Sequence, residues 1–313
     1  MKKLIALDGG GTKLDAVLFD ESGHILKHCV ARGGNATDIG KEEALRRFDA
    51  CMGTLLDGVS GPIDALYGGM AGVLPNGDFY SEHASETIEC ASVRFDDDGC
   101  NLISGGVGQA DGCGMVCGTG SSLFVRISGQ PLRHIGGKGY LIDTGGSGFD
   151  LGQQAIRMAL RSVDGRIGPT VLTELLAGIL GMPVSDAVIP AVHAGGRPYI
   201  ASFARAVFEG RARGDAVCQS IFENGAEQMA DLTRAAERYF SGPFPVIAGG
   251  GIIGSYPEYA EEIQKRGSPR AVLRVLDAPP VYGAAVEAMA DAGFPEDERF
   301  KARFLADYSA AAR

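Results

Sequence analysis

The sequence predicts an α/β protein built from a duplicated unit, with a cleft between the two copies. Two glycine-rich turns, Asp8-Gly9-Gly10-Gly11-Thr12 and Cys117-Gly118-Thr119-Gly120-Ser121, each follow one short apolar strand and precede another. In both places a Ser-Gly turn and a third apolar segment come next, at Ser22-Gly23 and at Ser128-Gly129. The order strand, glycine turn, strand, Ser-Gly turn, strand therefore occurs twice, about a hundred residues apart.

The first copy is expected to cover residues 1–112. The breakers Asp57-Gly58 and Ser60-Gly61-Pro62 end its first long helix. The expected elements are strands Leu4–Leu7, Ala16–Phe19, His24–Cys29, Ala65–Gly69 and Ser92–Phe95, with helices at Glu42–Leu56 and Phe79–Cys90.

The second copy is expected to cover residues 113–281, and a C-terminal helix over 282–313 would complete the first copy. No linker rich in Pro or Ser separates the copies, which indicates a tight hinge. Helices are expected at Leu151–Val163, Pro169–Leu180, Ile200–Glu209, Asp215–Tyr239, Tyr256–Lys265 and Tyr282–Ala292, and strands at Pro245–Ala248 and Val272–Leu276.

Composition narrows the class of protein. The net charge of −10 and the absence of a basic run argue against a nucleic-acid partner. No apolar run approaches the roughly 20 residues of a membrane span, and Asp8 ends the first apolar run too early for a signal peptide. The seven scattered cysteines suit free thiols. We therefore expect a cytoplasmic protein with no membrane partner.

The two glycine turns indicate a polyphosphate clamp. A turn rich in glycine lets backbone N–H groups approach an anion closely. Gly9–Thr12 would hold the β- and γ-phosphates of ATP, and Asp8 would bind Mg²⁺ through water. A plain hairpin remains the alternative for the first turn taken alone. The pair predicts an ATP-using phosphotransferase.

Three other segments carry candidate chemistry. One carboxylate of Asp96-Asp97-Asp98 could accept the proton of an attacking hydroxyl, although a solvated acidic turn fits the same residues. Gly249-Gly250-Gly251 could lie against adenine or form a tight turn before a helix. Asp143, Thr144 and Ser147 could bind a sugar, and Ser147 could equally cap a helix.

Asn35 has two open interpretations, as a turn residue in the left-handed region or as an amide that binds a substrate hydroxyl. The histidines and cysteines lack the spacing of a zinc site, and no P-loop motif of the Walker type is present.

Taken together, these motifs resemble the N-acetylglucosamine kinase branch of the BadF/BadG/BcrA/BcrD ATPases, within the actin/hexokinase/Hsp70 superfamily. The resemblance covers nearly the whole chain. It implies two RNase H-like domains, ATP and Mg²⁺ in the cleft, and phosphorylation of an amino sugar, usually at the 6-hydroxyl. The motifs are Leu7–Lys13, Gly33-Gly34-Asn35, Gly69–Gly72, Asp97-Asp98-Gly99, Cys117–Ser121, Gly136–Gly139, Gly146-Ser147-Gly148 with Gly152, Ala248–Gly251 and Pro280-x-x-Gly283-Ala284.

The resemblance also assigns roles. It implies that Asp98 is the catalytic base, Asn35 a sugar ligand and Asp8 the magnesium residue. Nucleotide-binding residues would be Gly10, Gly11, Thr12, Lys13, Gly118, Thr119, Gly120, Ser121, Gly249, Gly250 and Gly251. Substrate contacts would come from Asn35, Asp98, Gly137, Lys138, Asp143 and Thr144.

The chain departs from the family in one loop. Lys138 replaces a common Trp, and Thr144 and Gly145 replace an Asp and a Glu. ATP use is therefore better supported than the identity of the sugar. N-acetylglucosamine is the first expectation, with N-acetylmuramic acid, glucosamine or an ATPase activator of a dehydratase or reductase as alternatives. We expect a homodimer.

Overall fold

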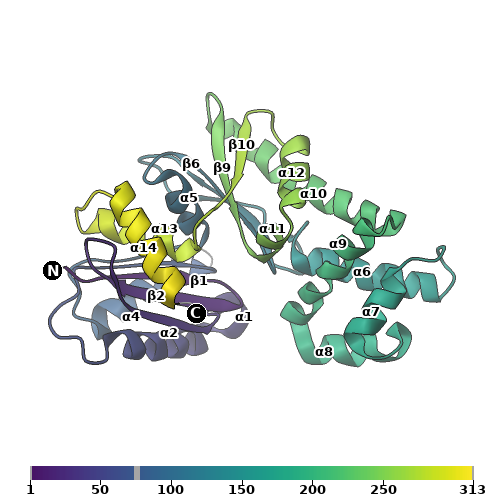
Figure 1. Ribbon diagram of the computed structural model, residues 1–313, viewed down its shortest axis with the longest axis horizontal. Coiled ribbons are helices and arrows are strands. Elements are labelled where there is room, and N and C mark those ends of the chain that lie inside the picture. Colours follow the sequence, from purple (N-terminus) through teal and green to yellow (C-terminus); the bar gives the residue numbers. More distant parts are fainter. Residues whose placement is uncertain (1, 74–77, 312–313) are drawn as a thin grey trace. The chain divides into compact units, whose positions relative to one another are not determined.

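The computed structural model describes residues 2–73 and 78–311. The chain divides into two compact units, one formed by residues 1–114 and 276–313 and the other by residues 115–275. The first contains the sheet that carries the Asp8 turn, and the second contains the sheet that carries the Gly118 turn (Figure 1).

The first sheet has five strands in the order β3-β2-β1-β4-β5. β1 pairs antiparallel with β2 and parallel with β4, so the sheet joins an antiparallel meander to a parallel half. β2 pairs antiparallel with β3, and β4 pairs parallel with β5. The strands are β1 Leu4–Gly9, β2 Lys13–Phe19, β3 Ile25–Arg32, β4 Ala65–Met70 and β5 Val93–Asp96.

Helices cover both faces of this sheet (Figure 1). On one face α2 packs on β2 and β3, and on the other α13 packs on β1 and β4 and against α5. The helices among the described residues of this unit are α1 Ala36–Ile39, α2 Lys41–Leu56, α4 Phe79–Thr87, α5 Gly99–Val107, α13 Pro280–Asp291 and α14 Glu298–Ala311.

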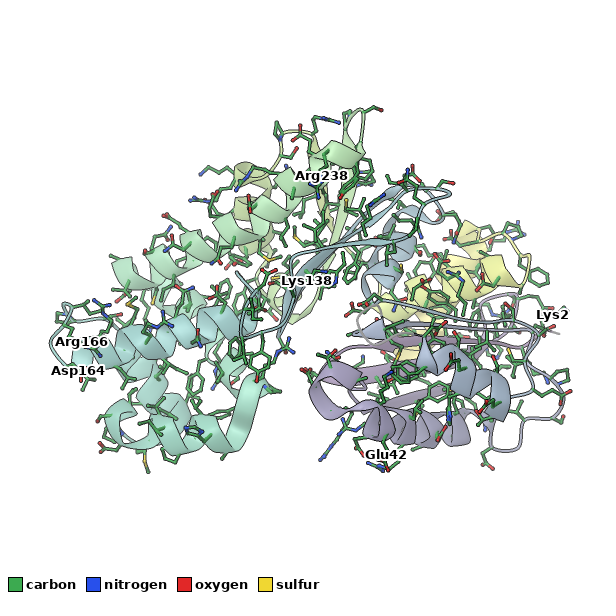
Figure 2. All side chains as sticks on the ribbon, turned by 180° about the vertical axis from the view of Figure 1, so that it is seen from behind. Lys2, Glu42, Lys138, Asp164, Arg166 and Arg238 are labelled. Atoms are coloured by element: carbon green, nitrogen blue, oxygen red, sulfur yellow. The ribbon has the colours of Figure 1, made fainter. Side chains whose placement is uncertain are left out.

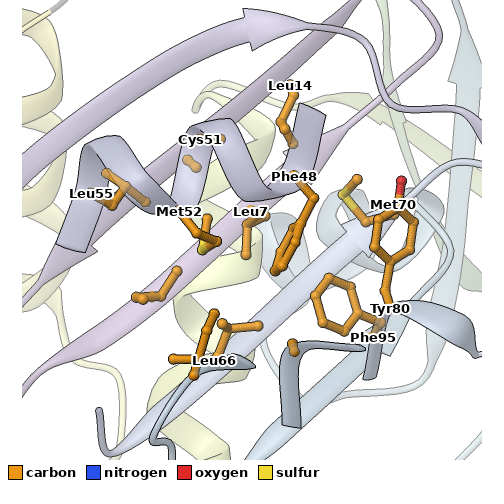
Figure 3. Packing of buried hydrophobic residues seen from close by; sticks show 14 of the residues in the cluster. Leu7, Leu14, Phe48, Cys51, Met52, Leu55, Leu66, Met70, Tyr80 and Phe95 are labelled. Carbon is orange, nitrogen blue, oxygen red and sulfur yellow. The ribbon is translucent and has the colours of Figure 1, made fainter. Parts of the chain in front are cut away.

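The core between α2 and the sheet is aromatic at one end and aliphatic at the other (Figure 3). Phe48 lies edge-on to Phe95, with ring centroids 5.9 Å apart, and Tyr80 stacks on Phe95 at 5.3 Å. The Tyr80 hydroxyl donates to the Gly34 carbonyl at 2.7 Å, which satisfies its polar end. This packing fixes the segment that leads into Asn35.

The second sheet repeats the order of the first. Its strands run β10-β9-β6-β7-β8, which is β8-β7-β6-β9-β10 from the other edge. β7 and β8 are antiparallel, and β9 and β10 are parallel, as in the first sheet. The predicted duplicated α/β fold of the actin-like ATPase type is confirmed. The strands are β6 Gly112–Cys117, β7 Ser121–Arg126, β8 Arg133–Ile135, β9 Phe244–Gly249 and β10 Ala271–Val275.

The second unit also contains a group of helices (Figure 1). Ser147 caps α6 by accepting from the Asp150 N–H, and Asp215 caps α10 by accepting from the Cys218 N–H. No single described helix could cross a membrane, although the bent pair α7 and α8 has the length and composition to do so together. The helices are α6 Gly148–Val163, α7 Leu172–Leu180, α8 Val184–Ser202, α9 Ala204–Ala212, α10 Ala216–Ala236, α11 Gly251–Ser255 and α12 Pro257–Arg266, with a 3₁₀ turn at Glu237–Tyr239.

Several expected elements differ from the observed ones. Most of α8 was not predicted, because Pro190, Pro198 and the glycines between them interrupt its helical pattern. The glycine-rich α5 was missed for a similar reason. The C-terminal segment is two helices, α13 and α14, rather than one, and the helix expected to reach Cys90 ends at Thr87.

Candidate functional site

The first glycine turn joins β1 to β2 and is largely exposed, as a ligand-binding turn must be. The Gly10 N–H donates to the Lys13 carbonyl at 2.9 Å, and the Gly33 N–H donates to the Thr12 carbonyl at 3.0 Å. A Cβ on Gly33 would lie 2.4 Å from the Gly11 carbonyl carbon, so only glycine allows this close approach. The turn is thus held in one shape by its own backbone and by Gly33.

Lys13 is engaged by a buried carboxylate. Its Nζ lies 2.6 Å from Asp15 Oδ2, and Asp15 also contacts His28 Nε2 at 2.8 Å and the Tyr308 hydroxyl. Asp15 is only 1% exposed, so burial favours its pairing with a cation. The ammonium group of Lys13 therefore neutralises Asp15 within the first unit.

Asp8 ends β1, and its partner was not foreseen from the sequence. The Asn101 Nδ2 donates to Asp8 Oδ1 at 2.7 Å and lies 3.2 Å from the Gly69 carbonyl. Asn101 is fully buried in the first turn of α5, and its Oδ1 has no partner among the described residues. A Cβ on Gly69 would lie 2.1 Å from that oxygen. Asn101 therefore fixes the orientation of the Asp8 carboxylate.

Glycine at position 283 keeps α13 against α5, where Asn101 lies. A Cβ there would lie 1.8 Å from the Asn101 carbonyl oxygen, so no other residue fits without a shift of the backbone. This close approach explains the glycine of the Pro280-x-x-Gly283-Ala284 motif. The motif therefore affects the site indirectly, because it determines the position of α5, which carries Asn101.

The three consecutive aspartates have different environments. Asp96 accepts from Arg94 Nη1 at 2.7 Å and from the Tyr67 hydroxyl at 3.2 Å, which is a structural role at the end of β5. Asp97 is 3% exposed. Asp98 is half-buried at the N-terminus of α5 and makes no side-chain capping bond. Asp98 is therefore more accessible than Asp97, and it is not paired with an arginine as Asp96 is.

Burial and neighbouring carboxylates shape the acidity of this region. Burial raises the pKa of Asp8 to about 6, against the opposing hydrogen bond from Asn101. Burial, Asp97 and Asp8 hold the pKa of Asp98 well above its usual range. Negative charge thus gathers at the ends of β1 and β5, where it is costly without a cation.

These residues fit a bound magnesium ion. A divalent cation at Asp8 would offset the clustered negative charge, and a carboxylate oxygen is a ligand that Mg²⁺ prefers. Among residues 2–73 and 78–311, no group of three or more acidic, His or Cys side chains could hold a metal ion. One carboxylate with water and phosphate oxygens is the usual arrangement for Mg²⁺ at a nucleotide.

Asn35 has an extended backbone, with φ −64° and ψ 106°, so the alternative of a turn residue in the left-handed region does not apply. Its Oδ1 caps α1 by accepting from the Thr37 N–H at 3.0 Å. A Cβ on Gly72 would lie 2.5 Å from that oxygen. The capping bond uses the oxygen of the amide and orients its NH₂ group, so Asn35 can still serve as a donor to a ligand.

The second glycine turn packs on two other segments of its unit. The N–H groups of Gly148 and Phe149, in the first turn of α6, donate to the Gly118 and Thr119 carbonyls at 2.8 and 3.1 Å. Gly250 has φ +110°, and a Cβ there would lie 2.5 Å from the Cys117 carbonyl. The structure therefore brings together the two glycine segments that were assigned to the nucleotide. Gly250 caps the short α11, so the tight-turn interpretation also holds.

The loop that departs from the family pattern lies beside the same turn. Thr144 Oγ1 contacts Ser147 Oγ at 3.0 Å. Gln228 fills the space beside Gly145, where a Cβ would lie 2.1 Å from its Oε1. Lys138, labelled in Figure 2, is exposed, and the Asp143 N–H donates to the Gly139 carbonyl at 2.8 Å. Short polar groups thus line this loop in place of two carboxylates.

His134 lies beneath the loop, stacked on Phe124 with centroids 4.5 Å apart. Burial and the charge of Lys138 lower its pKa to about 4, so the ring is neutral at physiological pH. A Cβ on Gly137 would lie 2.6 Å from the Ser121 carbonyl, which places Gly137 directly on β7. The loop is therefore anchored at Gly137 and exposed at Lys138.

Cys113 and Cys117 are fully buried in β6. Burial raises the pKa of each thiol to about 12, so both are protonated. A cluster shared between subunits needs thiolates at a surface. This environment disfavours the alternative of a dehydratase or reductase activator with an iron–sulfur cluster on these cysteines.

The fold and the paired glycine turns define an ATPase of the actin-like class, and comparison with known proteins agrees. Residues 5–288 match the BadF/BadG/BcrA/BcrD ATPase family, and the chain belongs to this family. The predicted family membership is confirmed.

The relatives include sugar kinases. The chain is 23% identical over 304 residues to the N-acetylmuramic acid/N-acetylglucosamine kinase of Clostridium acetobutylicum, covering 93% of this chain and 99% of that one. It is 25% identical to the N-acetyl-D-glucosamine kinase of Dictyostelium discoideum, covering 91% and 97%. The crystal structure of a candidate N-acetylglucosamine kinase from Chromobacterium violaceum superposes with a TM-score of 0.73 at 22% identity, covering 91% and 98%.

Two contacts of the site escaped sequence reasoning. Asn101 lies three residues after Asp98, a spacing that places both on one side of the first turn of a helix. This spacing could have indicated that the two side chains belong to one site, but the helix α5 at whose N-terminus they lie was not predicted. Arg197 lies in the unpredicted α8, and no local pattern links it to Gly120.

Proposed function

We propose that this protein is an ATP-dependent kinase that phosphorylates the 6-hydroxyl of an amino sugar, with N-acetylglucosamine as the first candidate. The observation that supports this most directly is the arrangement in the first unit. There a glycine turn begins directly after Asp8, Asn101 orients that carboxylate, and the half-buried Asp98 shares its electrostatic environment.

In this proposal the chain's own residues position the reactants and move one proton. Asp98 accepts the proton of the sugar hydroxyl as that oxygen attacks the γ-phosphorus, while the bond from this phosphorus to the bridging oxygen breaks and ADP leaves with the electron pair. The turns Gly10–Thr12 and Gly118–Ser121 bind the phosphates, and Gly249–Gly251 border the base. Asp8 would hold Mg²⁺, which would supply positive charge to the phosphates.

The raised pKa of Asp98 suits such a base. A carboxylate with an ordinary pKa is a weak proton acceptor at neutral pH, and one with a higher pKa accepts a proton more readily. The same feature requires the proton to leave Asp98 before the sugar reacts. The proposal therefore implies activity that increases with pH across the titration of this group.

The choice of sugar rests on the relatives and on the altered loop. Both curated relatives carry N-acetylglucosamine kinase in their names, and one also names N-acetylmuramic acid. In this chain Asn35, Gly137, Lys138, Asp143 and Thr144 are the proposed sugar contacts. N-acetylmuramic acid and glucosamine are the alternative substrates. We further propose a cytoplasmic homodimer that acts on a small molecule.

A coupled assay of ADP release tests the proposal. Purified protein is offered N-acetylglucosamine, N-acetylmuramic acid, glucosamine, N-acetylmannosamine and glucose in turn, each with ATP and with or without Mg²⁺. We expect turnover that requires Mg²⁺ and an amino sugar, with phosphate on the 6-hydroxyl by NMR of the product. ADP release that no sugar stimulates would refute the proposed kinase activity.

A further inference from the structure

Arg197 lies on the second glycine turn, although it belongs to none of the motifs that predicted the nucleotide site. The helical path of α8 breaks at Gly196, where φ is 62° and ψ is −156°. The break comes immediately before Arg197, and Pro198 follows it. A Cβ on Gly120 would lie 2.4 Å from Arg197 Nη2, so the guanidinium occupies the space that any other residue at 120 would need.

An aromatic platform supports the guanidinium. The Arg197 Cζ lies 5.4 Å from the centroid of the Tyr140 ring, within the range of a cation–π contact. Tyr140 in turn lies edge-on to Phe149, with centroids 5.2 Å apart. The Phe149 N–H donates to the Thr119 carbonyl in the turn itself. The turn and the platform are therefore attached to the same first turn of α6.

We propose that Arg197 binds the terminal phosphates of the nucleotide at the Gly118–Ser121 turn. This inference rests on the proposed function, which places the phosphates there. All the groups concerned lie within the second unit, so the proposal needs no assumption about the other unit. A guanidinium offers a planar fork of N–H donors that matches phosphate oxygens, and it keeps its charge at every physiological pH.

The position of Arg197 beside Gly120 gives a second reason for glycine at position 120. Glycine lets backbone N–H groups approach an anion, and here it also admits the arginine side chain to the same place. Tyr140 restricts the directions in which the guanidinium can point. Backbone donors and one fixed cation would then converge on the phosphates, which favours ATP and ADP over AMP.

Direct binding measurements test this inference. Isothermal titration calorimetry, without sugar, compares MgATP, MgADP and AMP for the wild type and for Arg197→Met, which keeps a long apolar side chain. We expect the variant to bind MgATP and MgADP about 10- to 100-fold more weakly, the usual effect of losing a charge-assisted hydrogen bond. Affinity for AMP should be unchanged. Arg205→Met, an exposed arginine in α9, is the matched control.

Arg197→Lys separates charge from geometry and should recover part of the lost affinity, because lysine keeps the charge but not the fork. The thermal midpoint of each variant is recorded as a control for folding. If Arg197→Met does not fold, the nucleotide affinities of Arg197→Lys and Tyr140→Leu are compared with those of the wild type instead. An equal loss for AMP and MgATP, or no loss for either, would overturn the inference. Because no sugar is present, a failed sugar screen with intact ATP binding would refute only the proposed acceptor.

Discussion

Replacing Asp98 by Asn is the perturbation that tests the proposed mechanism most directly. Asn keeps the size of the side chain and removes the proton acceptor. General-base catalysis contributes about 10²- to 10⁴-fold, so kcat should fall by a factor in that range. The affinity for ATP should change little, because Asp98 makes no proposed contact with the nucleotide.

The neighbouring carboxylate makes the test sharper. Asp97 is one cause of the raised pKa of Asp98, so Asp97→Asn removes a negative charge beside the base. Removal of such a charge lowers the pKa of the remaining carboxyl. The base must be deprotonated to act, so kcat/KM increases with pH through this pKa. In Asp97→Asn the acid limb should therefore move toward lower pH while the plateau is largely retained.

The assay is the initial rate of ADP release between pH 4.5 and 9, at saturating and at limiting sugar, with thermal midpoints as the control for folding. Near-normal turnover in Asp98→Asn would refute the assignment of the base. Loss of turnover in Asp97→Asn together with an active Asp98→Asn would move the role to Asp97. An acid limb that shifts toward higher pH in Asp97→Asn would refute the electrostatic reasoning.

Three other substitutions have defined outcomes. In Asn101→Leu, loss of the donor to Asp8 should raise the Mg²⁺ concentration for half-maximal activity about 10- to 100-fold, and an unchanged Mg²⁺ requirement would contradict this. Asp215→Ala should cost about 1 kcal/mol of unfolding free energy through the lost cap of α10. Burial raises the pKa of Asp215, but hydrogen bonds from backbone N–H groups outweigh burial and hold this pKa below its usual range. The stability from the cap is therefore present above about pH 4 and is lost as the pH falls further. Denaturant titrations at pH 7 and pH 3 measure the difference in unfolding free energy. Lys138→Met should reduce kcat/KM for N-acetylmuramic acid relative to N-acetylglucosamine by about tenfold or more, and an unchanged ratio would show that Lys138 only faces solvent.

The duplicated fold could be predicted because its signals are local. Short apolar runs around glycine turns determine strands, turns and their order, and the same pattern occurs at Asp8 and at Cys117. Family motifs added roles for Asp8 and Asp98 for the same reason, since each motif is a short continuous segment. The sequence thus determined the class of protein and the segments that carry its chemistry.

Tertiary structure decided which groups surround those segments. The partner of Asp8 is Asn101, 93 positions away in the sequence. Arg197, which contacts the second turn, follows a kink in α8, a helix that was not predicted because prolines interrupt its pattern. Lys13 pairs with Asp15, although its place in the turn predicted a contact with the nucleotide. A hydrogen bond or ion pair between distant residues depends on how strands and helices pack, and packing is a property of the whole core rather than of any one segment.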